Sequence, residues 1–235
     1  LAGNMRDVLL EKLTAYAEDL DIRCVVITGA GRAFCAGGDI EAMGQWQENN
    51  DTSGFTNLLG TVEKVVKKLR TMPQPVIAAI NGPAAGGGMN MALACDMRLG
   101  CEKTLFSESF VKIGLVPDWG GFESLTRLVG AAKSMELMMT GERVKAEEAY
   151  RLGLLNHILP FEGFMDHVQT FAERIADGPP QAIAAIKSGV YNALGASLDE
   201  VLEFEHQTQA TLILSDDARE GVRAFLEKRP PKFGA

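Results

Sequence analysis

The stretch VIAAINGPAAGGGMNMALA, residues 76–94, decides how this chain folds. Residues 76–80 are a short apolar run, bounded by prolines before it and by Asn81-Gly82-Pro83 after it, which is typical of a buried strand. Three glycines at 86–88 then lead straight into the apolar residues 89–94, where we expect a helix to begin. A buried strand, a glycine turn and a helix in direct succession favour an α/β fold with parallel strands.

The alternation continues on both sides of this stretch. Residues 23–28 are a short run rich in β-branched residues that is typical of another buried strand, and an amphipathic helix is expected before it at 5–20. A further helix at 56–70 is stopped by Pro73 and Pro75. From about residue 127 onward the pattern is mainly helical, with an internal boundary at Gly178-Pro179-Pro180 that divides the chain into 1–178 and 179–235. The helices predicted there span 130–140, 145–152, 164–177, 180–194, 198–213 and 216–227.

The amino-acid composition and net charge exclude several classes of protein. Hydrophobic residues make up 46% and charged residues 23% of the 235 residues, which predicts a packed globular core. A net charge of -8 argues against binding nucleic acid or an anionic membrane surface. The chain has no signal sequence, no apolar run of ~18 residues, and four cysteines without metal-ligand spacing, so we expect a cytoplasmic protein with reduced thiols and no metal site. Because no initiator Met precedes Leu1, we expect residues in front of it.

Neither glycine turn fits a nucleotide-binding motif. After the strand at 23–28, the third glycine of G-x-G-x-x-G falls on Phe34. The glycines at 37–38 and 86–88 are followed by Asp39 and Met89, not by the lysine of a phosphate loop. Another use fits better, because glycine lets a ligand approach backbone N–H groups that have no partner at the start of a helix. Two such turns side by side can stabilise one developing oxyanion, whereas either turn alone is better explained by close helix packing.

Taken together, these segments resemble the crotonase, or enoyl-CoA hydratase/isomerase, superfamily. The matching runs are VVITGAGRAFCAGGDI at 25–40, PVIAAINGPAAGGGMNMALACDMRLG at 75–100, FSESFVKIGLVPDWGG at 106–121, LTRLVGAAKSMELMMTGERVKAEEAYRLGLLNHIL at 125–159 and EGVRAFLEKRPPKF at 220–233. The resemblance implies a ββα spiral core, with a strand pair preceding Leu1, and a C-terminal helical trimerisation region. It also implies an acyl-CoA thioester substrate, no cofactor beyond the coenzyme A of that substrate, and a homotrimer or homohexamer.

The resemblance assigns roles residue by residue. The two oxyanion donors are implied to be the N–H groups of Gly38 and Gly87. Ala36, Asp39 and Ile40 are implied to lie along the adenosine and pantetheine parts of the substrate. Lys228, in the basic tail, is implied to contact a coenzyme A phosphate from a neighbouring subunit, with a solvated tail residue as the equal alternative.

Hydratases of this superfamily activate water with two glutamates, and this chain carries Asn90 and Phe110 at those positions. Asn90 can orient a polar group but cannot take a proton, so ordinary hydration is not expected. The run GLVPDWGG resembles that of 2-(1,2-epoxy-1,2-dihydrophenyl)acetyl-CoA isomerases, in which Asp118 matches the acid/base position. Apolar neighbours such as Trp119 predict a raised pKa for Asp118, while a turn aspartate after proline is the alternative interpretation. Phe110, Trp119, Phe122 and Met43 are expected to shape the acyl pocket, or else to pack in the core.

We therefore predict a cofactor-free enoyl-CoA isomerase that acts through Asp118. The alternative is an enoyl-CoA hydratase or thioester hydrolase that uses Glu108, or a water held by Asn90. A dehalogenase is disfavoured because its histidine would fall near Lys67, and an RNA-binding role is disfavoured by the net charge. Cys35 is interpreted as a packed thiol, and His157, His167 and His206 as surface or structural residues.

Overall fold

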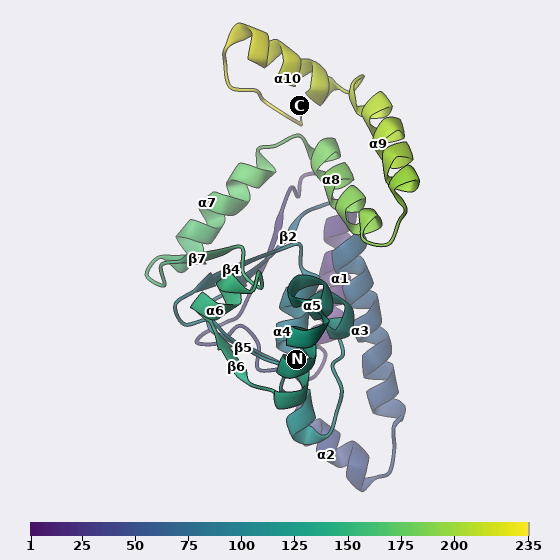
Figure 1. Ribbon diagram of the computed structural model, residues 1–235, viewed down its shortest axis with the longest axis vertical. Coiled ribbons are helices and arrows are strands. Elements are labelled where there is room, and N and C mark those ends of the chain that lie inside the picture. Colours follow the sequence, from purple (N-terminus) through teal and green to yellow (C-terminus); the bar gives the residue numbers. More distant parts are fainter. Residues whose placement is uncertain (235) are drawn as a thin grey trace.

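The computed structural model describes residues 1–234, and Figure 1 shows helices arranged around two small sheets. The larger sheet has the order β1-β2-β4-β7 and all of its pairs are parallel. Its strands are β1 (Val25–Thr28), β2 (Val76–Ile80), β4 (Met97–Cys101) and β7 (His157–Leu159). Both strands predicted from the sequence are thus confirmed, and they are direct neighbours. β2 is buried throughout as predicted, whereas only Val25 of β1 is buried, so the prediction of burial is wrong for most of β1.

The smaller sheet has the order β3-β5-β6, in which β3 and β5 are parallel and β5 and β6 antiparallel. Its strands are β3 (Pro83–Ala85), β5 (Leu105–Ser107) and β6 (Arg143–Lys145). Along the chain, β2 and β3 come in succession and are followed by a helix, and β4 and β5 repeat the order. These two turns of the chain each add one strand to each sheet and then a helix, which is the ββα spiral that the resemblance implied.

Most helices lie where the apolar periodicity predicted them. The confirmed helices are α1 (Met5–Glu18), α3 (Ser53–Thr71), α4 (Gly87–Ala94), α6 (Ala146–Arg151), α7 (Phe164–Ala176), α8 (Pro180–Ala193), α9 (Leu198–Leu212) and α10 (Asp216–Glu227). The sequence did not predict α2 (Ile40–Glu48) or the short 3-10 helix η1 (Ser109–Ile113). Helix α5 (Gly121–Thr140) consists of two helical parts that meet at the non-helical backbone of Gly130 (φ 76°, ψ 165°); the part after Gly130 is the helix predicted over 130–140, and the part before it was not predicted.

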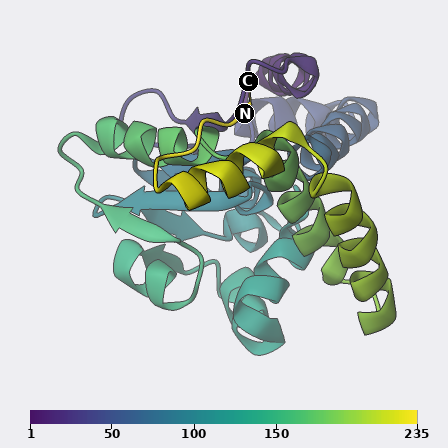
Figure 2. The same cartoon turned by 90° about the horizontal axis from the view of Figure 1, so that it is seen from above.

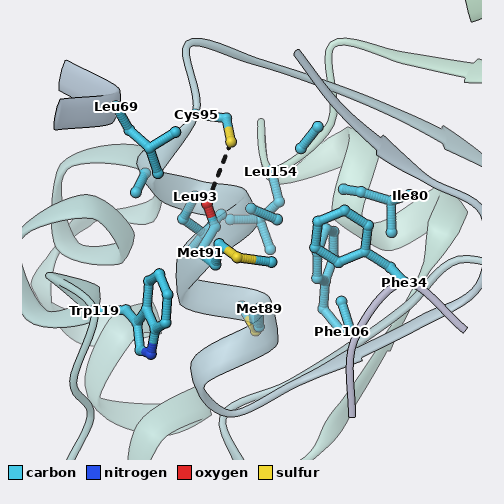
Figure 3. Close-up of a cluster of buried hydrophobic side chains, with 14 of the residues drawn as sticks. Phe34, Leu69, Ile80, Met89, Met91, Leu93, Cys95, Phe106, Trp119 and Leu154 are labelled. Atoms are coloured by element: carbon cyan, nitrogen blue, oxygen red, sulfur yellow. Dashed lines mark hydrogen bonds between the residues drawn. The ribbon is translucent and has the colours of Figure 1, made fainter. Parts of the chain in front are cut away.

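The core is centred on β2 and α4. All five residues of β2 are fully buried, and every residue of α4 is buried as well. A helix that is apolar on all sides can only be stable inside the protein. Figure 3 shows Met89 and Met91 of α4 among the side chains of Ile80, Phe106 and Leu154. The first turn of α4 is consequently held by packing from all directions.

Helix α8 is joined to this core by a buried ion pair. Lys187 Nζ lies 2.8 Å from Asp96 Oδ2 and also donates to the carbonyl oxygens of Leu69 and Gln74. The hydroxyl of Tyr191 donates to Asp96 Oδ1 at 2.8 Å. These bonds compensate both charges for the loss of water.

Helices α9 and α10 lie at one end of the molecule and α2 at the other (Figure 1). Seen from above, helices lie on both sides of the central strands (Figure 2). In residues 1–234, no helix combines the length and apolar character that a membrane crossing requires.

Candidate active site

The two glycine turns lie side by side. The N–H of Phe34 donates to Pro83 O at 3.0 Å, and the N–H of Ala85 donates to Cys35 O at 2.9 Å, so the first turn extends the edge of β3. The side-chain amide of Asn81 adds bonds to the carbonyl oxygens of Gly29 (3.0 Å) and Gly31 (2.9 Å). Backbone and side chain together fix the spacing between the turns.

The backbone just before Gly38 reaches the start of α4. A Cβ atom built on Gly37, whose φ is +104°, would lie 3.0 Å from Ala85 O and 3.9 Å from Gly87 N. Gly87 is the first residue of α4, so its N–H has no partner within the helix and sits at the positive end of the helix dipole. Among residues 1–234, no acceptor takes a hydrogen bond from the N–H of Gly38 or of Gly87. Both donors are therefore available to a ligand.

Both turns open into one pocket of about 430 Å³. Of the residues predicted from the sequence, Ala36, Gly38, Ile40, Gly87, Phe110 and Asp118 all line it. The remaining walls come from α2, α3 and the segment 109–117, and they are largely apolar, with Met43, Leu59 and Leu115 among them. An apolar hollow with a few convergent polar groups is the usual form of a small-molecule site.

Asp118 supplies the carboxylate of this pocket. It lies between η1 and α5, where its carbonyl oxygen accepts from the N–H of Gly121 at 2.9 Å. Its Oδ1 lies 3.5 Å from the position of a Cβ on Gly87 and has no hydrogen-bond partner in the described chain. Burial raises the pKa of Asp118 to about 6, because the charged form has lost part of its hydration. A carboxylate of this kind is a stronger base than an exposed aspartate.

Asn90 and Glu108 lie behind the pocket and not in its wall. Asn90 is fully buried, and its Nδ2 donates to Asp118 O at 3.0 Å and more weakly to Glu108 Oε2 at 3.4 Å. Glu108 is 1% exposed, and its Oε1 has no partner in residues 1–234. Burial raises the pKa of Glu108 to about 7, the bond from Asn90 lowers it, and the charge of Asp118 raises it further. The sequence left the direction of this side chain open, because a three-residue strand gives no reliable alternation; only the fold shows that it points inward.

Four other predicted residues lie outside the pocket wall, and one of them is Phe122, which is 55% exposed in the first turn of α5 and neither lines the pocket nor packs in the core. Trp119 is 3% exposed and packs in the core beside Met89 and Met91 (Figure 3), with its Nε1 only 2.9 Å from a Cβ position on Gly87. Asp39 caps α2, its Oδ1 accepting from the N–H of Ala42 at 3.1 Å. Lys228 is exposed at the end of α10, at the opposite end of the molecule from α2 (Figure 1).

Comparison with known proteins agrees with this geometry. The family model described as enoyl-CoA hydratase/isomerase matches residues 1–235. The chain belongs to the enoyl-CoA hydratase/isomerase family. A probable enoyl-CoA hydratase of Rhodobacter capsulatus is 40% identical over 213 residues, covering 91% of this chain and 81% of the relative. The 1,2-epoxyphenylacetyl-CoA isomerase of Escherichia coli is 38% identical over 234 residues, covering 97% of this chain and 87% of the relative.

Solved structures share the whole fold. The crystal structure of a putative enoyl-CoA hydratase/isomerase from Mycobacterium abscessus superposes with a TM-score of 0.95 at 31% identity, covering 100% of this chain and 90% of the other. The fold is therefore that of the crotonase superfamily, as the resemblance implied, and the family acts on acyl-CoA substrates. Since relatives of this chain are named as hydratases or as isomerases, membership of the family alone does not determine which of the two reactions the protein catalyses.

Proposed function

We propose that this member of the enoyl-CoA hydratase/isomerase family moves a carbon–carbon double bond of an acyl-CoA thioester from the 3,4 to the 2,3 position. Asp118 removes a proton from C2, and the electron pair of that C–H bond passes into the thioester carbonyl, giving a dienolate. The same carboxyl then returns the proton to C4, which leaves the double bond between C2 and C3. No atom is gained or lost, so neither water nor a cofactor takes part.

The observation that carries the proposal is the unpartnered Oδ1 of Asp118 beside Gly87. A group that both takes and returns a proton works best with a pKa near the working pH. Burial brings the pKa of Asp118 to about 6, so the carboxylate is ionised at neutral pH yet more basic than usual. The free N–H groups of Gly38 and Gly87 open into the same pocket, which suits them to the enolate oxygen.

A second candidate is hydration or thioester hydrolysis. It is favoured by Glu108, whose pKa of about 7 suits a proton-transfer group and which Asn90 links to the Asp118 segment. Against it, Glu108 is almost fully buried behind the pocket wall, and Phe110 lines the pocket where the resemblance implies a glutamate in hydratases. Isomerisation needs only the one carboxylate that reaches the pocket.

We further propose that the protein assembles as a homotrimer or homohexamer through its C-terminal helices. These helices and the connection between α9 and α10 expose large apolar side chains, including Leu202, Ile213, Leu214, Val222, Phe225 and Leu226. Apolar surface of this extent is typical of a face that is covered by another chain. Lys228 lies at the end of α10, and we expect it to contact a coenzyme A phosphate of a neighbouring subunit in such an assembly.

The test compares Asp118→Asn with Glu108→Gln, two changes that keep side-chain shape. With 3-hexenoyl-CoA in heavy water, Asp118→Asn is expected to lower both isomerisation and proton exchange at C2 by ~10²–10⁴-fold, the usual contribution of a general base. Acyl-CoA affinity should stay nearly unchanged, and Glu108→Gln should retain most isomerisation. Undiminished exchange in Asp118→Asn excludes Asp118 as the base. Rapid hydration of crotonyl-CoA that only Glu108→Gln abolishes selects the second candidate.

A further inference from the structure

A second cavity continues directly from the candidate active site. It has a volume of about 520 Å³ and lies between α2, α3 and the segment after η1. Five apolar residues line both this far cavity and the pocket of Asp118, and these are Ile40, Met43, Phe55, Ile113 and Leu115. Met43 stands at the junction, since its Cε lies 2.7 Å from a Cβ position on Gly38. A chain bound by its thioester at Gly38 and Gly87 thus has an apolar path into the far cavity.

Helix α2 turns an unburied side to this path, on which Ile40 and Met43 are the apolar side chains. Ile40, Met43, Gly44 and Gln47 line the far cavity at positions i, i+3, i+4 and i+7, which lie on one side of a helix. None of the residues of α2 is buried, and Ile40 is 59% exposed. A helix normally buries its apolar side against the core. Here the missing contact partner is what an apolar ligand in the far cavity would supply.

The outer wall of the far cavity is an aromatic pair. The rings of Trp46 and Phe55 lie 5.9 Å apart between centroids, with an interplanar angle of 52°. The indole of Trp46 rests on the start of α3 at Gly54, where a Cβ would lie 2.4 Å from Nε1. This position of the indole therefore depends on the absence of a side chain at residue 54. At the rim, Asp51 has its pKa lowered by hydrogen bonds from Ser53, so it stays ionised and disfavours a ligand with a second carboxylate.

We infer that Trp46, seated on Gly54, makes the protein select acyl-CoA thioesters with extended or ring-bearing apolar groups over short ones, through the wall that its indole adds to the far cavity. The inference rests on the proposed function only for the position of the thioester. Apolar burial favours the longer group, because each methylene that leaves water adds to affinity. A short acyl group such as butanoyl is expected to fill the space around Met43 and to contact the aromatic pair less than a longer one.

The experiment measures equilibrium binding of butanoyl-, octanoyl- and phenylacetyl-CoA, which lack the 3,4 double bond and bind without turnover. The wild-type protein is expected to bind the two larger ligands roughly tenfold or more tightly than butanoyl-CoA. Trp46→Ala and Gly54→Ala should each remove most of that preference while changing butanoyl-CoA affinity less than about twofold. Gly60→Ala is the matched control, because it adds the same methyl group to the same helix with nothing within 4 Å of it.

Two outcomes overturn the inference. One is equal affinity of the wild-type protein for all three ligands. The other is an equal loss for all three ligands in Trp46→Ala and Gly54→Ala, which makes the indole a purely structural element. Binding does not depend on proton transfer, so this experiment can fail independently of the isomerase proposal. A clear size preference without isomerisation overturns only the proposed reaction. Isomerisation without a size preference overturns only this inference.

Discussion

Replacing Glu108 by glutamine is expected to stabilise the folded protein at neutral and alkaline pH. The carboxyl of Glu108 is 1% exposed, accepts one long hydrogen bond from Asn90 and has an unpartnered Oε1. An ionised carboxylate in such a place has lost its hydration without a compensating cation. Glutamine keeps the size and the acceptor of this side chain but never carries the charge.

The size of the effect follows from the shift in pKa. Burial raises the pKa of Glu108 from its ordinary 4.5 to about 7 in the folded state. Between these two values the folded protein holds the proton more tightly than the unfolded chain, so the free energy of unfolding falls as the pH rises. At ~1.4 kcal/mol for each pH unit, the wild-type protein loses ~3 kcal/mol by pH 8, but only ~1 kcal/mol by pH 5. The glutamine variant carries no charge at this position, so its free energy of unfolding does not fall with pH for this reason.

Thermal unfolding at fixed protein concentration measures the difference. Glu108→Gln should raise the unfolding temperature by ~6–12 °C at pH 8 and by about a third of that at pH 5, given ~2–4 °C per kcal/mol for a chain of this length. Glu162→Gln, which removes an exposed carboxylate in the turn between β7 and α7, should change it little at either pH. The same gain at both pH values, or none at pH 8, would mean that the Glu108 carboxylate is hydrated or paired in the folded protein, and the reasoning fails.

Two further changes address the oxyanion donor and the anchor of α8. Gly87→Ala places a carbon 2.9 Å from the buried indole nitrogen of Trp119, so the backbone N–H of residue 87 should shift and kcat should fall by ~10²–10³-fold. The control Gly60→Ala should leave kcat unchanged. Equal kcat values for the two variants would speak against Gly87 as an oxyanion donor. Lys187→Met leaves the charge of Asp96 buried without its cation and should lower the free energy of unfolding, measured in urea, by ~3–5 kcal/mol. The control is Lys133→Met, which removes a surface ion pair with Glu136. A decrease for Lys187→Met no larger than that for Lys133→Met would contradict this account.

Local signals predicted much of the fold because most elements carry their own pattern. The apolar run of β2 and the prolines around it fixed a buried strand, and the apolar periodicity of α7 to α10 fixed their bounds to within a residue or two. Helix α2 escaped prediction because its residues follow a glycine turn and none of them is buried. The strands β3, β5 and β6 have three residues each, too few for alternation to be visible.

The sequence predicted the part of the candidate site in which backbone N–H groups supply the chemistry. It predicted less well those residues whose role depends on the direction in which the side chain points. The resemblance placed Gly38, Gly87 and Asp118 at a common site, and the structure brings all three to one pocket. It did not reveal that Trp119 is buried and packs against Gly87. An aromatic residue next to a predicted base can either line the pocket or pack in the core, and the sequence does not distinguish the two. Burial depends on contacts between distant segments, which no local pattern records.

The unburied apolar side of α2 has a consequence for how the protein responds to its ligand. A segment with few buried contacts opens locally at a small free energy, so we expect α2 to open readily in the empty protein. On the inference above, an acyl chain in the far cavity completes the packing of α2 and raises that opening free energy. Chain length is then sensed as order in the helix that carries Met43 up to the oxyanion donor, and the substrate itself finishes folding the wall that encloses it.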